Sequence, residues 1–227
     1  MEAANKQVII VAGGSGTRMQ SKLPKQFLTI NDVPIIIYTI QQFLNFNDKI
    51  KICVVINPNF YDYCQSLLAE HQLNNKNILL IKGGETRFHS VQNGINALDN
   101  NNGITAVHDA VRPCLSLQLI TKGFELAQKQ QALIPVIPLK DSIRQIKDNN
   151  TVALNRNHYC LVQTPQFYNT SLLNKAYQQN FNSTFTDSAS VVEALNHPIT
   201  TMEGETSNLK ITTKIDLLIA AHYLKAQ

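Results

Sequence analysis

The alternation of short apolar runs with amphipathic helical patterns is the feature that most limits how this chain can fold. Runs rich in β-branched residues, such as "QVIIVA", "NILLIK" and "ITAVHDA", are typical of buried strands. Longer stretches between them, such as "PIIIYTIQQFLNF" and "TRFHSVQNGINAL", repeat apolar residues every three or four positions, as helices do. Strands that alternate with helices predict an α/β fold, in which an open, mostly parallel, twisted sheet carries helices on both faces.

Three segments with glycines or charges directly follow strand-like runs. They are "AGGSGTR", "GGETR" and "HDAVRPC". Rossmann-like open sheets bind their ligands at the carboxyl ends of the strands. The sequence therefore predicts that these three segments meet in one crevice at that edge of the sheet.

The pattern changes between residues 138 and 162. Two alternating, polar-rich runs flank the turn signal "DNN", which predicts an extended β-hairpin arm. A polar hairpin has little core of its own. We therefore expect this arm to protrude from a single domain of residues 1–227 and to pack against a partner subunit.

Composition and charge exclude several classes of protein. The longest apolar runs, such as "PIIIYTI", fall short of the ~18–20 residues that span a bilayer, and the N-terminus lacks a signal-peptide pattern. We therefore expect a cytoplasmic protein without membrane contact. The net charge of +4 comes from scattered Lys and Arg rather than a basic stripe, which argues against nucleic acid as a partner. The 4 cysteines form no C-x-x-C pair, which predicts neither a zinc site nor a disulfide framework.

The glycine-rich loop after the first strand is suited to phosphate. Gly13, Gly14 and Gly16 let the backbone approach a ligand closely and turn successive N–H groups inward as an anion nest. The P-loop pattern is absent, and Met19 stands where the dinucleotide-binding fingerprint needs its third glycine. A plain tight turn is the alternative when the loop is considered alone.

Two cations that follow this loop favour a bound triphosphate. Arg18 offers a planar fork for phosphate oxygens, whereas Lys25 offers a compact charge whose swing is restricted by Pro24. Phosphoryl transfer needs such positioning and charge stabilisation more than a nucleophilic triad. A solvated surface pair is the plainer alternative for the two cations.

An acidic residue follows the buried run "ITAV". A carboxylate at this position, Asp109, is costly unless it is paired or bound to a metal. Mg²⁺ prefers few carboxylates together with phosphate oxygens and water, so one Asp beside a triphosphate is chemically adequate. The neighbouring His108 is assigned a structural role, because histidines at strand ends more often serve the fold than the chemistry.

Seven motifs occur along the chain in a characteristic order. They are "AGGSGTRM" with "PKQFL", "GGETRFHSV", "VHDAVRPC", "LKDSI", Arg156 with "QTPQFY", "FTDSAS" and "NLKIT". In order and spacing they resemble the 2-C-methyl-D-erythritol 4-phosphate cytidylyltransferases of the non-mevalonate isoprenoid pathway, over nearly the whole chain. The resemblance implies a nucleotidyltransferase that forms 4-diphosphocytidyl-2-C-methyl-D-erythritol and pyrophosphate from CTP and methylerythritol phosphate. The substrate phosphate would attack the α-phosphorus of CTP directly.

The resemblance also implies roles for individual residues. The CTP phosphates would be held by Ala12, Gly13, Gly14 and Gly16, and the nucleoside by Gly84, Glu85, Ser90 and Ala110. Charge at the reacting phosphates would be stabilised by Arg18, Lys25 and Lys210. Methylerythritol phosphate would be held by Arg112, Ser142, Arg156, Thr164 and Thr186. Asp109 would hold Mg²⁺ or another divalent cation.

The family is homodimeric, and its arm completes the active site of the partner subunit. By resemblance, Ser142 and Arg156 are the residues that the arm would deliver. Ser142 stands where threonine is usual, which keeps the hydroxyl. Ser207 stands where an acidic residue is common, so a second carboxylate on the metal side is missing, and Glu205 is the hypothetical substitute.

Several of these assignments have alternatives. Thr86 as a helix cap would explain "GGETR" without a ligand, and a salt bridge at a helix N-terminus would explain Arg112. Ribitol-5-phosphate cytidylyltransferases share the glycine loop, "HDAVRP" and "QTPQ", whereas "LKDSI" and "TDSASVVE" favour the methylerythritol enzymes. A non-catalytic nucleotide-binding module on the same scaffold is the alternative of another class. The presence of every inferred catalytic cation and of Asp109 argues against it.

Overall fold

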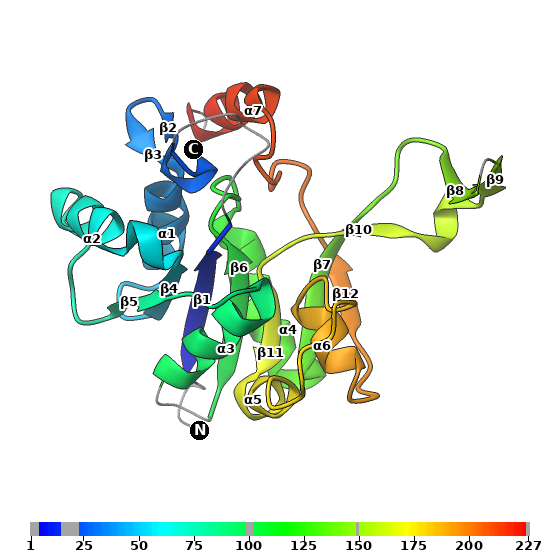
Figure 1. Ribbon diagram of the computed structural model, residues 1–227, viewed down its shortest axis with the longest axis horizontal. Coiled ribbons are helices and arrows are strands. Elements are labelled where there is room, and N and C mark those ends of the chain that lie inside the picture. The colour runs from blue at the N-terminus through cyan, green and yellow to red at the C-terminus, as the bar shows by residue number, and fades with distance from the viewer. Residues whose placement is uncertain (1–4, 15–22, 99–101, 149, 226–227) are drawn as a thin grey trace.

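The protein folds around one mixed, mostly parallel sheet (Figure 1). The computed structural model describes residues 5–14, 23–98, 102–148 and 150–225. The strands follow the order β10-β7-β11-β6-β1-β4-β5, and β12 pairs with β7. Their bounds are Lys6–Ala12 for β1, Lys51–Ile56 for β4, Ile78–Lys82 for β5, Ile104–Asp109 for β6, Ala132–Pro138 for β7, Cys160–Val162 for β10, Gln166–Asn169 for β11 and Thr200–Glu203 for β12.

The pairing within this sheet confirms the α/β fold expected from the sequence. β1 pairs in parallel with β4 and β6, β4 with β5, and β7 with β12. β10 is antiparallel to β7. β11, which the strand patterns did not predict, lies antiparallel between β6 and β7.

Helices cover both faces of the sheet, as expected. One face carries α1 (Ile35–Phe46), α2 (Tyr61–Glu70) and α4 (Leu117–Gln130). The other face carries α3 (Arg87–Ala97), α5 (Thr170–Ala176) and α6 (Ser188–Glu193). Side chains of a strand point alternately to its two faces, so Val8 and Ile10 of β1 join the first core and Ile9 joins the second.

A third, smaller core lies beyond the carboxyl ends of the strands (Figure 1). The elements around it are the paired strands β2 (Thr29–Ile30) and β3 (Val33–Pro34), and the helix α7 (Lys214–Lys225). Its buried members include Ile30, Val111, Ile211 and Ala220. Because Ile211 is anchored there, the preceding segment, which carries Lys210, is held close to the end of β6.

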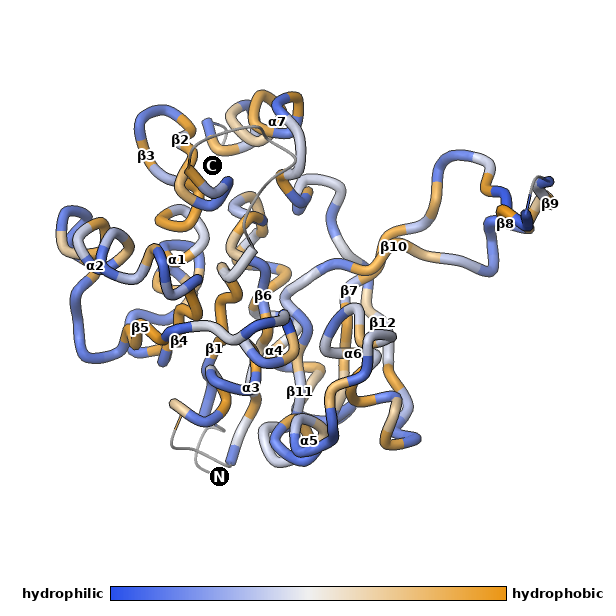
Figure 2. The backbone as a smooth tube through the Cα atoms, viewed as in Figure 1, coloured by the Kyte–Doolittle hydropathy of each residue, from blue (hydrophilic) through white to orange (hydrophobic). Residues whose placement is uncertain are grey.

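Hydropathy follows the layers of the fold (Figure 2). Hydrophobic residues concentrate on the central strands, whereas the β8–β9 end of the arm is mainly hydrophilic. Among the helices in the described part of the chain, none combines the length and the apolar character needed to cross a bilayer.

The predicted hairpin arm is present and projects from the main body (Figure 1). Within residues 138–162, β8 (Ile143–Lys147) and β9 (Asn150–Leu154) pair antiparallel with Ile143 opposite Leu154. The 3-10 helix η4 (Arg156–His158) and β10 lead the chain back to the sheet. The role of the arm in a dimer stays a prediction.

Candidate active site

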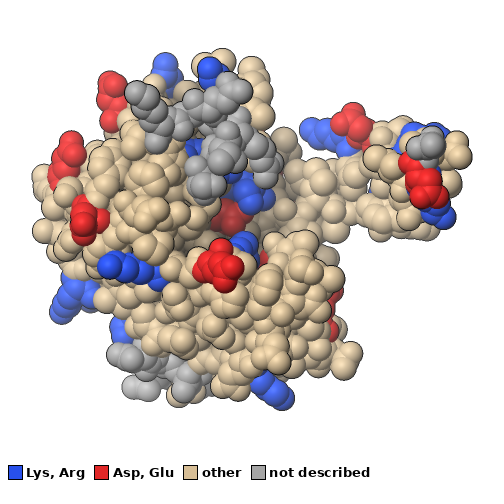
Figure 3. Space-filling model, viewed as in Figure 1, with Lys and Arg blue, Asp and Glu red and all other residues tan. Residues whose placement is uncertain are grey.

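A cavity of about 480 Å³ opens at the carboxyl edge of the sheet, within the size range of small-molecule sites. Its walls come from the end of β1, from the turn between β5 and α3, and from the end of β6. Figure 3 shows basic and acidic side chains meeting in a hollow near the middle of the molecule. The three segments that the sequence placed at strand ends therefore converge, as predicted.

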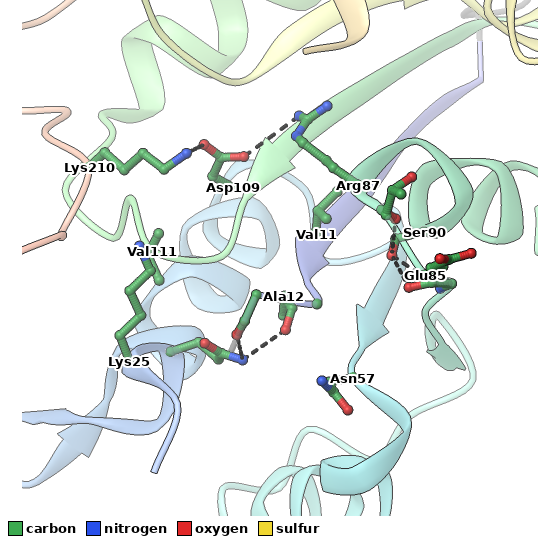
Figure 4. A pocket seen from close by; sticks show the side chains of 15 residues that line it. Val11, Ala12, Lys25, Asn57, Glu85, Arg87, Ser90, Asp109, Val111 and Lys210 are labelled. Atoms are coloured by element: carbon green, nitrogen blue, oxygen red, sulfur yellow. Dashed lines mark hydrogen bonds and ion pairs between the residues drawn. The ribbon is translucent and has the colours of Figure 1, made fainter. Parts of the chain in front are cut away.

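Asp109, the last residue of β6, is the centre of charge in this cavity. Its Oδ2 lies 2.8 Å from Lys210 Nζ and 3.7 Å from Arg112 Nε, and its Oδ1 lies 3.6 Å from Arg87 Nη2. Figure 4 shows Arg87 and Lys210 approaching the carboxylate from opposite sides. Burial alone would raise the pKa of Asp109, but the three cations outweigh it and hold the pKa below its usual value. The carboxylate is therefore ionised at neutral pH.

His108 lies behind Asp109 and is fully buried. Burial lowers the pKa of His108 to about 3, against the opposite influence of the neighbouring Asp109 carboxylate. The Nε2 atom lies 3.2 Å from the carbonyl oxygen of Arg112, so a neutral ring donates from Nε2. These contacts agree with the structural role expected for His108.

The wall formed by the end of β1 is tied to Lys25 through Gln26. Gln26 is buried, and its Nε2 donates to the carbonyl oxygens of Ala12 at 2.8 Å and Gly14 at 3.4 Å. Lys25 and Gln26 both belong to the 3-10 helix η2 (Lys25–Phe27), and Lys25 lines the cavity. Gln26 thus fixes the start of the glycine loop relative to the cation that follows it. Gly16 and Arg18 lie outside the described residues.

The turn between β5 and α3 forms the opposite wall. The N–H of Gly84 donates to Ser90 Oγ at 3.2 Å, and this hydroxyl donates to the carbonyl oxygen of Thr86 at 2.9 Å. A Cβ at Gly84 would overlap His89, so only glycine fits this turn. Thr86 is the N-cap of α3, which agrees with the helix-cap alternative for "GGETR". The turn that contains Thr86 also lines the cavity.

Comparison with known proteins identifies the chain. A family model for 2-C-methyl-D-erythritol 4-phosphate cytidylyltransferase matches residues 7–226. The chain belongs to this family. A curated relative of that name from Bacteroides fragilis is 43% identical over 219 residues, which cover 96% of this chain and 99% of the relative. The resemblance seen in the seven motifs is thereby confirmed.

Solved structures of the family share the fold of this chain. The 2-C-methyl-D-erythritol 4-phosphate cytidylyltransferase of Francisella tularensis has 34% identity and a TM-score of 0.82, with 96% of this chain and 99% of that chain covered. The 4-diphosphocytidyl-2C-methyl-D-erythritol synthase of Anaerococcus prevotii has 27% identity and a TM-score of 0.82, with 97% and 96% covered. The Rossmann-like fold is confirmed by these neighbours.

Most of the described residues that family resemblance assigned to nucleotide, metal and phosphate line the one cavity. They are Ala12, Gly13, Gly14, Lys25, Gly84, Glu85, Ser90, Asp109 and Lys210. Residues that are distant in sequence are thus brought together at the carboxyl edge of the sheet.

The remaining described candidates do not line the cavity of their own chain. Ala110, Arg112 and Thr164 are buried beside Asp109. Thr186 is exposed just before α6, and Ser142 and Arg156 are exposed on the arm. Arg112 forms an ion pair with Asp109 and donates to the carbonyl oxygen of Asn208 at 2.8 Å. Its cation therefore supports the carboxylate from within, rather than facing the cavity as expected for a substrate-phosphate ligand.

Sequence reasoning missed Arg87, which does line the cavity. It is the first residue of α3, and its guanidinium donates to Ser188 Oγ at 3.3 Å while facing Asp109. The signal was present in "GGETR", since an arginine that follows a glycine turn at a strand end is placed at the ligand edge. Gln26 and Asn57, which precedes the 3-10 helix η3 (Pro58–Phe60), were also missed.

The hypothesis that Glu205 supplies a second metal carboxylate gains no support from the contacts of its side chain. Its Oε2 accepts from the backbone N–H of Ser116 at 3.2 Å, and its Oε1 accepts from the Ser116 hydroxyl. Ser116 is the N-cap of α4, so Glu205 is engaged at a helix N-terminus, where a negative charge is favourable. Glu205 is not among the residues that line the cavity.

We predict that His108 makes the protein less stable in mild acid. The ordinary pKa of a histidine is 6.5, whereas burial lowers the pKa of His108 in the folded protein to about 3, so the unfolded chain binds more protons below pH 6.5. The contribution of neutral His108 to the free energy of unfolding is complete above pH 6.5 and is lost as the pH falls, by up to ~1.4 kcal/mol per pH unit. Denaturant titrations between pH 7 and pH 5 give the free energy of unfolding at each pH. In His108→Gln, the slope of this free energy against pH should be shallower than in the wild type, by an amount that corresponds to at most one bound proton. Equal slopes would contradict a buried neutral histidine.

Proposed function

We propose that this chain is a cytoplasmic cytidylyltransferase that converts CTP and 2-C-methyl-D-erythritol 4-phosphate into 4-diphosphocytidyl-2-C-methyl-D-erythritol and pyrophosphate. The observation that carries the proposal is the meeting of Asp109, Lys25 and Lys210 beside a glycine turn in one cavity. Membership of the methylerythritol family supports the choice of sugar phosphate. Both substrates are polyanions, and cations at the carboxyl edge of an open sheet suit them.

The reaction is a direct displacement at phosphorus. An oxygen of the methylerythritol phosphate forms a bond to the α-phosphorus of CTP, the bond to the bridging oxygen breaks, and pyrophosphate leaves. Negative charge grows on the phosphoryl and leaving oxygens, so fixed cations around them lower the barrier. Lys25 and Lys210 face this space, and Arg18 is assigned the same role from the family motif.

We assign cytosine recognition to the β5–α3 turn. Gly84 and Glu85 bring backbone groups to the cavity wall, and the Ser90 hydroxyl braces the turn through Gly84 and Thr86. A backbone held without side-chain bulk suits the edge of a small pyrimidine. Ala110 lies buried next to this nucleotide side, with its N–H donating to the carbonyl oxygen of Val11.

We assign Asp109 to a divalent cation, Mg²⁺ or a similar ion. Asp109 and Glu85 are the carboxylates that line the cavity within the described residues, and Mg²⁺ needs few carboxylates when a triphosphate supplies further oxygens. Oδ2 of Asp109 contacts Lys210, so a divalent cation held by this carboxylate would take the place of that ammonium group. A divalent cation there would supply positive charge against the triphosphate.

Release of pyrophosphate from CTP in the presence of Mg²⁺ tests the function. Turnover is expected with methylerythritol phosphate and not with ribitol 5-phosphate. Turnover only with ribitol 5-phosphate would establish the related enzyme class instead. Binding of CTP without turnover of either sugar phosphate would establish a nucleotide-binding module.

We predict that Lys25→Ala lowers kcat by on the order of 10²- to 10⁴-fold, because a cation that meets developing charge is removed. Steady-state kinetics of pyrophosphate release measure this loss, and thermal denaturation should show little change. Lys51→Ala is the matched control, since Lys51 is exposed at the opposite, amino-terminal end of β4. Near-normal turnover in Lys25→Ala would show that the role is misassigned.

We further propose a homodimer in which each arm completes the active site of its partner. The arm exposes apolar side chains that a monomer leaves in water, including Ile146 at 79% and Leu161 at 51%. Ser142 and Arg156 lie on the same arm and outside the cavity of their own chain. Packing of the arm against a second copy of the chain would bury its exposed apolar side chains. It would also bring Ser142 and Arg156 to the cavity of that copy.

Mixing two inactive variants tests these shared sites. Lys25→Ala and Arg156→Ala each disable every site of their own homodimer. In a mixed dimer, one site combines the intact Lys25 of one chain with the intact Arg156 of the other. Equilibrated equal mixtures should regain about a quarter of wild-type activity, from simple statistics of a twofold dimer. A mixture as inactive as its components, or a fully active monomer, would contradict shared sites.

A further inference from the structure

The segment that carries Lys210 links β12 to α7 and has no secondary structure of its own. Residues 204–213 all belong to the described part of the chain, and none of them lies in a helix or a strand. Lys210 reaches from this segment to Asp109 Oδ2, 2.8 Å away, although its side chain is 44% exposed (Figure 4). A long side chain loses rotamer freedom when it is held in one place. The position of Lys210 therefore depends on how firmly the backbone of its segment is anchored.

The near end of the segment is held by the side chain of Gln163, which is buried. Its Oε1 accepts from the N–H of Glu205 at 3.1 Å, and its Nε2 donates to the carbonyl oxygen of Glu205 at 2.7 Å. The same amide contacts Asn208 through Oε1 at 3.5 Å and through Nε2 at 3.3 Å, so all four of its hydrogen-bonding positions are used. The N–H of Gln163 donates to the carbonyl oxygen of Pro135 in β7 at 2.8 Å. The backbone of Glu205 is thereby tied to the sheet.

The side chain of Glu205 ties the same point of the segment to the start of α4. Its Oε2 accepts from the backbone N–H of Ser116 at 3.2 Å, and its Oε1 accepts from the Ser116 hydroxyl. That hydroxyl also accepts from the N–H of Leu119 at 3.0 Å, so it is held between the helix and the carboxylate. The helix is firmly packed, because Leu119, Ile120 and Phe124 are buried in the first core. Glu205 is therefore fixed to the sheet through its backbone and to a helix through its carboxylate.

We propose that Glu205 is a positioning residue that fixes Lys210 relative to Asp109 from outside the cavity. This inference rests on the proposed function, in which Lys210 meets the charge of the phosphoryl group. The other end of the segment is fixed by Ile211, whose N–H donates to the carbonyl oxygen of Val111 at 2.9 Å. Glu205 and Ile211 thus hold the backbone on both sides of Lys210. Loss of the Glu205 carboxylate weakens the first of these anchors, and Lys210 shifts away from Asp109.

Crystal structures without ligands test the proposal directly. In Glu205→Ala we expect the distance from Lys210 Nζ to Asp109 Oδ2 to grow from 2.8 Å to beyond about 4 Å, the limit of an ion pair. In Glu203→Ala, the matched control, this distance should not change, because Glu203 is exposed at the end of β12. An unchanged ion pair in Glu205→Ala would overturn the proposal. This readout needs no substrate, so it holds whether or not the proposed reaction is correct.

Steady-state kinetics of pyrophosphate release separate positioning from general stability. We expect Glu205→Ala to lower kcat about 10- to 100-fold, because a small misplacement beside the reacting atoms is costly, and to change the KM for CTP by less than about threefold. In a Lys210→Ala background the same substitution should lower kcat by less than about threefold more, since its effect passes through Lys210. A full further loss would overturn the proposal. If Lys210→Ala alone keeps a normal kcat, the proposed role of Lys210 fails, and Glu205 is judged from the crystal distance alone.

Two conservative variants distinguish positioning from metal binding. Glu205→Gln keeps the length and an acceptor but loses the charge, whereas Glu205→Asp keeps the charge and is one methylene shorter. Positioning predicts the higher kcat in Glu205→Gln, because that side chain still reaches Ser116. A higher kcat in Glu205→Asp would overturn the proposal in favour of a charged metal ligand, and equal values would also contradict it. This comparison decides the matter if Glu205→Ala does not fold by circular dichroism.

Discussion

The fold depends on one costly group, the carboxylate of Asp109 buried at the end of β6. A charge taken out of water requires opposite charges and hydrogen bonds at close range. Arg87 supplies one cation from α3, Arg112 one from the loop after β6, and Lys210 one from the segment before α7. Elements that are distant in sequence must therefore be in place together before this charge is paired, and they meet beside the cavity.

The layers of the fold were predictable because they follow from local periodicity. Apolar runs and helical repeats set the strands and the helices, and the rule for strand ends predicted the edge of the sheet at which the cavity lies. β11 was missed because "QFYN" is short, follows Pro165 and alternates no more clearly than a loop. Its position between β6 and β7 is a property of the assembled sheet, which no local pattern encodes.

The candidate site was predictable in its wall-forming residues and less so in its internal contacts. Family motifs located Lys25, Gly84 and Asp109, which line one cavity. They do not tell whether a side chain faces a ligand or supports one that does. Arg112 follows a buried strand, and its side chain lies inside the fold behind Asp109. Arg87 begins a helix at the cavity edge, and its side chain lines the cavity. Such orientations are set by tertiary packing rather than by sequence spacing.

We propose that Asp109 exchanges the ammonium group of Lys210 for a divalent cation when CTP binds. A crystal structure of the protein with CTP and Mg²⁺ measures this directly through the distance from Lys210 Nζ to Asp109 Oδ2, which is 2.8 Å here. We predict that the ion lies on the carboxylate, that this distance lengthens beyond contact, and that Lys210 turns toward phosphate. An intact Lys210–Asp109 pair with the metal ion held elsewhere would contradict the account.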